Sequence, residues 1–297
     1  MLTIKIIHPA SRALDDTLKD KIRKLENSGL DCKIACDFPE GDTKRFWLAH
    51  SSEKRLPVLR DALFSETYDV ILCGRGGYGM SDLLEEINWR ELTFVKPKIV
   101  VGFSDISSLL SKIYRELLWP AIHGPMINTD KWQDLSQSDL TALTGLFVDH
   151  QQVVTLTNDS RYSDNIVTTG PLFGGCLSVL TNLIGTNYLP VSLKNHILFF
   201  EDIAEPLPRV LRNLRQWKQS GLIDECQAIV LGQFEKSRID SEEMKSLFVE
   251  EVKGLTNKPV YLCRQFGHGP INFPIQLGAL AEVDQKGLRW QWNHKQP

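Results

Sequence analysis

Two strand-to-helix turns in the first half of the chain carry residue types that bind anions. The first spans 74–79 and reads Gly-Arg-Gly-Gly-Tyr-Gly, so Gly74, Gly76 and Gly79 match the pattern G-x-G-x-x-G. Backbone amides in such a turn can bind a pyrophosphate, and Asp105 follows where a ribose-binding acid, roughly 20 residues on, is expected. The same glycines are also typical of a tight turn that needs a positive φ.

The second turn spans 102–105 and reads Gly-Phe-Ser-Asp. A serine on a sharp turn between a buried strand and a helix can present its hydroxyl as a nucleophile, with helix N-terminal amides to stabilise an oxyanion. This turn resembles the nucleophile elbow G-x-S-x-G, although Ile106 stands where the last glycine is expected. Ser104 fits equally well as the N-cap of the following helix, and the sequence of the turn alone does not distinguish a nucleophile from an N-cap.

A nucleophilic serine needs a general base and a group that orients this base. His123 and His268 both occur in the sequence His-Gly-Pro, and neither is favoured over the other by its neighbours. Glu201 and Asp202 follow the apolar run 197–200 directly. A carboxylate at the end of a buried strand is costly unless it is paired, so an imidazole partner is expected there.

Strand and helix patterns that alternate along the first half position these turns. Apolar runs at 2–7, 32–36, 68–73 and 98–103 predict strands, and amphipathic segments at 14–27, 52–64, 81–87 and 106–118 predict helices. The alternation predicts an α/β fold whose N-terminal domain is a Rossmann- or flavodoxin-like parallel sheet. We expect this domain at 1–127, a polar linker at 128–167, and a smaller α/β or β-rich C-terminal domain at 168–297.

The composition excludes several classes of protein. The chain has 297 residues, a net charge of −3 and 42% hydrophobic residues, as in an ordinary globular protein that does not bind nucleic acid. No apolar run is long enough to span a membrane, and no signal-peptide pattern occurs, so we expect a cytoplasmic protein. The six cysteines form no C-x-x-C pair and no H-E-x-x-H motif occurs, so no metal site is expected.

Six motifs, in order along nearly the whole chain, resemble those of the LD-carboxypeptidase family of serine peptidases. This family includes the muramoyl-tetrapeptide carboxypeptidases and the microcin-immunity peptidases. The motifs are Arg-Gly-Gly-Tyr-Gly at 75–79, Gly-Phe-Ser-Asp-Ile at 102–106, His-Gly-Pro-Met at 123–126, Gly-Gly at 174–175 with Gly-Thr at 185–186, Phe-Glu-Asp at 200–202, and Gly-His-Gly at 267–269.

The resemblance implies a Ser-Glu-His triad in which Ser104 is the nucleophile, His268 the general base and Glu201 the carboxylate that orients the imidazole. It also implies an oxyanion hole made by the backbone amides of Gly77 and Asp105. The reaction that it implies is removal of the terminal D-Ala from cytoplasmic murein tetrapeptides in peptidoglycan recycling, through an acyl-enzyme. A homodimer that needs no cofactor is implied as well.

The sequence departs from the family pattern near the expected substrate pocket. Cys176 stands where the family commonly has Asn, and Pro208 and Leu211 replace its usual Tyr and Asp. With Cys176, the candidates for binding substrate are Arg75, whose guanidinium suits a terminal carboxylate, and Tyr78. The departures keep open a microcin-immunity-type peptidase that cleaves aminoacyl-nucleotide antibiotics. Alternatives from other classes are an NAD-dependent dehydrogenase and a non-catalytic muropeptide-binding protein.

Overall fold

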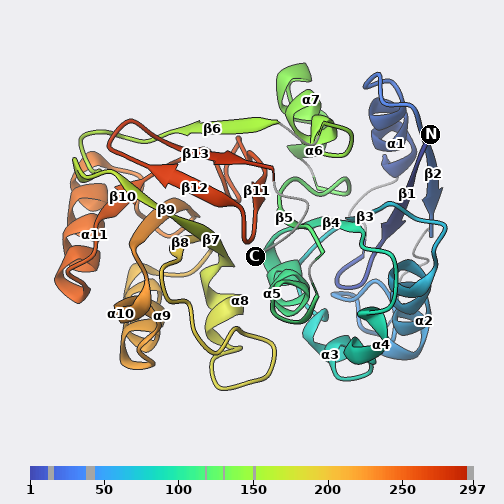
Figure 1. Cartoon of the computed structure of the whole chain (residues 1–297), viewed down its shortest axis with the longest axis horizontal. Coiled ribbons are helices and arrows are strands. Elements are labelled where there is room, and N and C mark those ends of the chain that lie inside the picture. The colour runs from blue at the N-terminus through green and yellow to red at the C-terminus, as the bar shows by residue number, and fades with distance from the viewer. Residues whose placement is uncertain (13–16, 38–43, 118, 130, 150–151, 293–297) are drawn as a thin grey trace. The chain divides into compact units, whose positions relative to one another are not determined.

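Short apolar strands from the first part of the chain pair into a parallel sheet. In the computed structural model (Figure 1), these strands are β1 (Leu2–Ile7), β2 (Cys32–Cys36), β3 (Val70–Cys73), β4 (Ile99–Gly102) and β5 (Ala121–His123). They follow the order β5-β4-β3-β1-β2, and each neighbouring pair is parallel. Every residue of β3, β4 and β5 is buried, as expected for strands that are covered on both faces.

Helices cover both faces of this sheet. They are α1 (Leu18–Glu26), α2 (Ser52–Phe64), α3 (Ser81–Leu84), α4 (Trp89–Leu92), α5 (Ser107–Glu116), α6 (Lys131–Asp134) and α7 (Gln137–Gly145). In Figure 1, α1, α6 and α7 lie above the strands, and α2 to α5 lie below them. The strand order with helices on both faces is that of a flavodoxin-like doubly wound sheet, which confirms the predicted fold class.

The carboxyl ends of β1, β3 and β4 bring three loops to one edge of this sheet. The chain order reverses between β1 and β3, which are neighbours although β2 lies between them in sequence. Ligands of doubly wound sheets bind outside the carboxyl ends of the strands at such a switch point. Both turns singled out from the sequence, 74–79 and 102–105, leave the sheet at this edge.

The structure describes residues 1–12, 17–37, 44–117, 119–129, 131–149 and 152–292. They fall into two compact units, Met1–His150 and Gln151–Asn293. The segment 128–167, expected to be a linker, contains α6 and α7 in the first unit and β6 (Val153–Thr157) in the second. Within the described ranges, no helix is long and apolar enough to cross a bilayer.

The second unit is built on a mixed sheet. Besides β6, its strands are β7 (Thr168–Cys176), β8 (Ile197–Ile203), β9 (Ala228–Glu235), β10 (Val260–Leu262), β12 (Leu280–Val283) and β13 (Gly287–Gln291), and the two-residue β11 (Ile275–Gln276) lies between β10 and β12 in sequence. The sheet order is β10-β9-β8-β7-β12-β13-β6, with β7 to β10 parallel to one another and β12, β13 and β6 antiparallel.

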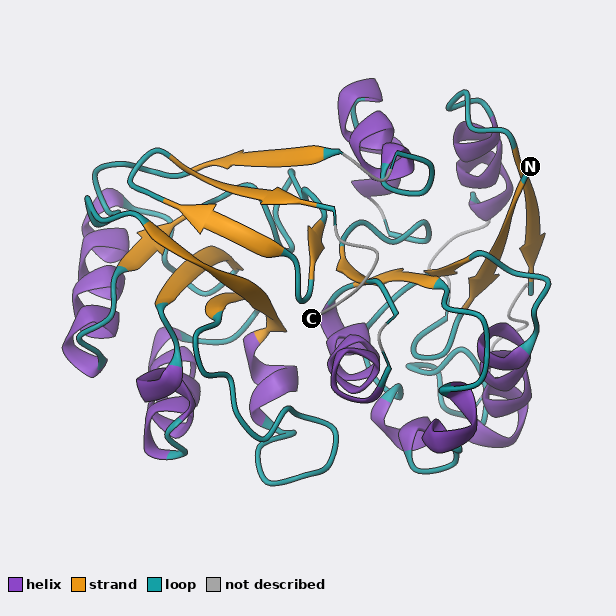
Figure 2. Ribbon diagram, in the orientation of Figure 1, coloured by secondary structure: helices purple, strands orange, loops and turns teal. Residues whose placement is uncertain are grey.

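Four helices accompany the parallel half of this sheet. They are α8 (Leu177–Thr181), α9 (Leu207–Gln219), α10 (Leu222–Glu225) and α11 (Glu242–Leu255). α9 packs against the other three, and Figure 2 shows them together beside the strands. The buried side chains Val210, Leu214 and Trp217 form the apolar stripe by which α9 joins the core.

One sequence-predicted element differs from the structure in a way that matters for the site. β8 continues to Ile203, so Glu201 and Asp202 lie within the strand rather than after it. The predicted helix 14–27 is observed as α1, and its first positions, 14–16, lie outside the described residues.

Candidate active site

Ser104 occupies a strained backbone position, two residues after the end of β4. Its φ is 60°, a conformation that residues with a side chain rarely adopt. Phe103, and not Ser104, is the N-cap of the short 3₁₀ turn Ser104–Ile106 that leads into α5. The N-cap alternative for Ser104 is therefore wrong. A strained, half-exposed serine at the start of a helix has the backbone geometry of a nucleophile elbow.

The glycine turn packs directly against this serine. A Cβ on Gly76 would lie 2.7 Å from Ser104 Cβ, 2.9 Å from Ser104 Oγ and 3.1 Å from the Asp105 nitrogen. Gly77 has a φ of 102°, and a Cβ there would lie 2.2 Å from Ser11 Oγ. Glycine is thus required at 76 for close approach and at 77 for both space and conformation.

Side chains accept hydrogen bonds from two of the backbone amides around this turn. Tyr78 N–H donates to Ser11 Oγ at 3.3 Å, and Met80 N–H donates to Asp105 Oδ2 at 2.9 Å. Among the residues that the structure describes, no acceptor takes the N–H of Gly77 or that of Asp105. Two unused amides beside a serine hydroxyl are what an oxyanion hole requires.

The Asp105 side chain is buried and does not face solvent. It is 7% exposed, and burial raises the pKa of its carboxyl above the ordinary value, against the opposing effects of the Met80 N–H and Arg55. Its bond to Met80 links the Ser104 turn to the end of the glycine turn. The Asp105 carboxylate therefore already binds the Met80 amide, whereas the dinucleotide alternative would require it to bind a ribose hydroxyl.

In the second unit, β8 and the loop after β10 bring a carboxylate and an imidazole together. His268 Nδ1 lies 2.6 Å from Glu201 Oε2, and the Glu201 side chain is completely buried. Gly267 has a φ of 114°, and a Cβ there would lie 2.9 Å from Glu201 Oε2. The other His-Gly-Pro histidine, His123, is buried in β5 and packs edge-on against Phe103. His268 thus has the carboxylate partner that an activated imidazole requires.

The loop that carries His268 is fixed on both sides. Gly267 N–H donates to Asn272 Oδ1 at 2.9 Å, and Gln233 Nε2 donates to the carbonyl of Ile271 at 3.2 Å. A Cβ on Gly269 would lie 1.7 Å from Gln233 Oε1, so a side chain there would displace the Gln233 amide that holds the loop. An imidazole held at Nδ1 by a buried carboxylate leaves Nε2 as the nitrogen that exchanges protons with substrate.

Asp202 has a different role from its neighbour Glu201. Asp202 Oδ2 accepts the Ser178 N–H at 2.8 Å, and Oδ1 accepts the Ser178 hydroxyl at 3.1 Å and the Cys176 thiol at 3.4 Å. Burial raises the pKa of Asp202 above its ordinary value, and the charge of Glu201 adds to this. Residue types alone make both carboxylates candidates, and the family resemblance implies Glu201; Asp202 instead supports the start of α8.

The three candidates for binding substrate lie on both units. Arg75 Nη1 donates to the Arg12 carbonyl at 3.0 Å, and Tyr78 is 52% exposed with its hydroxyl 3.1 Å from Asp82 Oδ1. The Asp82 carboxylate raises the pKa of Tyr78. Cys176 pairs with Glu201 in the β7–β8 register, and burial raises the pKa of its thiol. Within the described ranges, no group of three His, Cys, Asp or Glu side chains could hold a metal ion.

Sequence reasoning missed Ser11 and Arg55. Ser11 follows β1 and touches the glycine turn, and Arg55 lies on α2. Neither belongs to a motif, and Arg55 occurs in a helix that reads as charged and amphipathic. Only the strand order, which places β1 beside β3, brings them to the turn.

Comparison with known proteins gives consistent results over both units. The family model for the LD-carboxypeptidase N-terminal domain matches residues 4–124, and the model for the C-terminal domain matches residues 169–283. The murein tetrapeptide carboxypeptidase of Pseudomonas aeruginosa is 30% identical, over 97% of this chain and 94% of that protein.

Two solved structures show the same fold. The muramoyltetrapeptide carboxypeptidase from Oxalobacter formigenes superposes with a TM-score of 0.83 at 24% identity, over 97% of this chain and 98% of that one. The microcin C7 self-immunity protein MccF, in complex with adenosine monophosphate, superposes with a TM-score of 0.83 at 18% identity, over 99% of this chain and 97% of that one.

Proposed function

Because this chain belongs to the LD-carboxypeptidase family, we propose that it releases the C-terminal D-Ala from murein tetrapeptides through a Ser104-His268-Glu201 triad. The observation that carries the proposal is the contact of His268 Nδ1 with the buried Glu201 Oε2 at 2.6 Å. A buried carboxylate that holds one imidazole nitrogen makes the other nitrogen a base for a serine hydroxyl. The strained backbone at Ser104 supports its role as that hydroxyl.

The proposed reaction proceeds by two acyl transfers. Ser104 Oγ attacks the carbonyl carbon of the bond before D-Ala, and His268 accepts the hydroxyl proton. The tetrahedral intermediate collapses, the C–N bond breaks, and His268 returns the proton to the D-Ala amine. A water molecule then attacks the acyl-serine ester while His268 accepts one of its protons. The C–O bond to Ser104 breaks, His268 returns the proton to Ser104 Oγ, and the tripeptide leaves with its new carboxylate. Glu201 remains ionised and stabilises the imidazolium in both steps.

The oxyanion of both intermediates is proposed to lie between the amides of Gly77 and Asp105. Their N–H groups donate to no acceptor among the described residues, and they flank the contact between Gly76 and Ser104. Each donor of such a hole is worth roughly 10²- to 10³-fold in kcat. Membership of this family supports an oxyanion rather than a dinucleotide as the group that the glycine turn binds.

Murein tetrapeptide is the substrate that the relatives favour. The similar Pseudomonas aeruginosa protein is a murein tetrapeptide carboxypeptidase. In this proposal Arg75 pairs with the terminal carboxylate, and Tyr78 and Cys176 contact the peptide. We further propose that the reaction takes place in the cytoplasm, as part of peptidoglycan recycling, and that the enzyme is a homodimer, which sedimentation of the purified protein tests.

A second candidate substrate is an aminoacyl-nucleotide. Cys176, in register with Glu201, replaces the Asn that the family commonly has, and Pro208 and Leu211 also depart from its pattern. Because these three positions depart from the family pattern, the proposal extends to an aminoacyl-nucleotide as an alternative substrate.

Mass spectrometry of the products distinguishes the two candidate substrates from each other and from binding without cleavage. The purified protein is incubated separately with murein tetrapeptide, with the same peptide ending in L-Ala, and with an aminoacyl-sulfamoyl-nucleotide. Loss of one Ala from the D-Ala peptide alone supports the proposal. Cleavage of the nucleotide conjugate alone supports the second candidate. If calorimetry shows that tetrapeptide binds but none of the three compounds is cleaved, the proposed peptidase activity is contradicted and a muropeptide-binding protein is indicated.

A further inference from the structure

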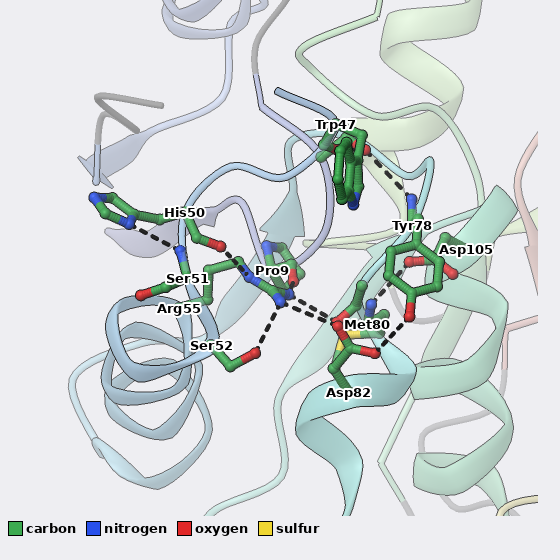
Figure 3. Close-up of polar contacts among 12 residues, drawn as sticks. Pro9, Trp47, His50, Ser51, Ser52, Arg55, Tyr78, Met80, Asp82 and Asp105 are labelled. Atoms are coloured by element: carbon green, nitrogen blue, oxygen red, sulfur yellow. Dashed lines mark hydrogen bonds and ion pairs between the residues drawn. The ribbon is translucent and has the colours of Figure 1, made fainter. Parts of the chain in front are cut away.

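Arg55 is a buried arginine whose five N–H groups all have acceptors. Its side chain is 2% exposed. Nε donates to the His50 carbonyl at 2.8 Å, and Nη2 donates to Ser52 Oγ at 3.2 Å and to Asp82 Oδ2 at 3.4 Å. Nη1 donates to the carbonyls of Pro9 and Gly79. Figure 3 shows the guanidinium at the centre of these contacts.

These bonds join the two loops that leave the sheet at its switch point. Pro9 lies in the loop after β1, and Gly79 ends the turn after β3. The Nη1 bond to the Gly79 carbonyl is 2.7 Å long, and a Cβ on Gly79 would lie 2.9 Å from Nη1. One planar group therefore sets the separation of the two loops.

The loop after β1 in turn fixes the peptide that carries the Gly77 amide. Ser11 N–H donates to the Gly76 carbonyl at 3.1 Å, and Ser11 Oγ accepts the Tyr78 N–H at 3.3 Å and donates to the Trp47 carbonyl at 2.6 Å. In a trans peptide the N–H points away from the carbonyl. Because Ser11 binds the Gly76 carbonyl, the Gly77 N–H of the same peptide is directed to the opposite side.

From these contacts we propose that Arg55 and Ser11 are positioning residues of the reaction, which orient the Gly77 amide toward the oxyanion without touching substrate. This inference rests on the proposed function of the site. Arg55 fixes the distance between the loop after β1 and the glycine turn. Ser11, on the first of these loops, fixes the orientation of the peptide between Gly76 and Gly77. An oxyanion hole displaced by about 1 Å can lose on the order of 10²-fold in rate.

The test uses Arg55→Lys, which keeps the charge but has too few donors, and Ser11→Ala. The second variant keeps the Ser11 N–H that binds the Gly76 carbonyl but removes the hydroxyl that anchors Ser11 between the Tyr78 N–H and the Trp47 carbonyl. The matched control is Arg60→Lys on the same helix α2, since exposed Arg60 donates to the Glu86 carbonyl, away from the glycine turn. We expect Arg55→Lys and Ser11→Ala to lower kcat for D-Ala release about 10²-fold with KM within twofold, and Arg60→Lys to match wild type.

A second readout does not depend on the peptide. A fluorophosphonate forms a bond from Ser104 Oγ to phosphorus, expels fluoride and places its phosphoryl oxygen in the oxyanion hole. We expect its second-order labelling rate at Ser104 to fall in parallel with kcat in both variants. Circular dichroism and thermal unfolding establish that each variant is folded, and Ser11→Ala decides the matter if Arg55→Lys does not fold.

The outcomes separate this inference from the proposed substrate. Wild-type labelling without D-Ala release, slowed in the variants, supports the inference and contradicts the murein substrate. Labelling and turnover within twofold of wild type in a folded Arg55→Lys or Ser11→Ala protein overturns the inference alone. If Ser104 of the wild type does not react with the probe, the nucleophile assignment fails and the inference fails with it.

Discussion

Glu201 is the residue whose surroundings most constrain the chemistry. Its side chain is completely buried, and an ionised carboxylate in that position is costly without a partner. His268 provides one partner at 2.6 Å, and the glycine at 267 leaves room for the contact. At the scale of single residues, a buried carboxylate and a loop imidazole thus depend on each other.

Replacing Glu201 by Gln tests this dependence. The amide has the shape of the carboxylate but cannot stabilise an imidazolium, and it favours the wrong tautomer of His268. We expect kcat to fall on the order of 10⁴-fold with little change in KM, by analogy with other triads. The measurement is steady-state release of Ala, with Glu250→Gln on the exposed face of α11 as the control. Activity above a tenth of wild type in the folded Glu201→Gln protein would exclude the orienting role.

At the scale of elements, β8 presents two adjacent carboxylates to different partners. Its register with β9 shifts between Phe200 and Asp202, and successive side chains of a strand point to opposite faces. Glu201 therefore contacts His268, whereas Asp202 accepts the Ser178 amide at the start of α8. The strand supplies one carboxylate to the proposed chemistry and the other to the adjoining helix.

Asp202 should make the free energy of unfolding depend on pH. Burial raises the pKa of Asp202 above 3.8, so the folded state binds the proton more tightly than the unfolded state. The resulting stability is complete below about pH 3.8 and is lost as the pH rises through the folded-state pKa. We expect the free energy of unfolding of wild type minus that of Asp202→Asn to decrease with rising pH in urea titrations.

Asp159→Asn provides a control of opposite sign for this measurement. Hydrogen bonds from Arg161 lower the pKa of Asp159 below 3.8. Its stabilisation is present above that value and is lost as the pH falls. Parallel pH trends for the two differences would contradict the protonation argument for Asp202.

A further prediction concerns the close approach of the glycine turn to Ser104. A Cβ on Gly76 would lie 2.7 Å from Ser104 Cβ, whereas a Cβ on Gly254 in α11 meets nothing within 4 Å. We expect Gly76→Ala to displace Ser104 and lower kcat at least 10²-fold. Gly254→Ala should keep full activity and gain about 0.5–1 kcal/mol of stability. Equal turnover in the two folded variants would show that the contact with Ser104 is unimportant.

At the scale of the whole molecule, the sequence predicted the parallel sheet because each central strand is a continuous apolar run. The family could be recognised because its motifs are short and local. No single segment of sequence encodes the strand order, and it is the pairing of β1 with β3 that brings Ser11 and Arg55 to the glycine turn. Likewise, residue types alone do not distinguish Glu201 from Asp202, whereas the extension of β8 to Ile203 places them at successive strand positions with different partners.

The central claim is that Ser104 is the nucleophile, and one experiment tests it directly. Wild type, Ser104→Ala and the surface control Ser246→Ala are incubated with murein tetrapeptide, and released Ala is followed by mass spectrometry. We predict turnover for wild type and Ser246→Ala, and a loss on the order of 10⁶-fold for Ser104→Ala, as for other triad serines. Release by Ser104→Ala above a tenth of the wild-type rate would contradict the account.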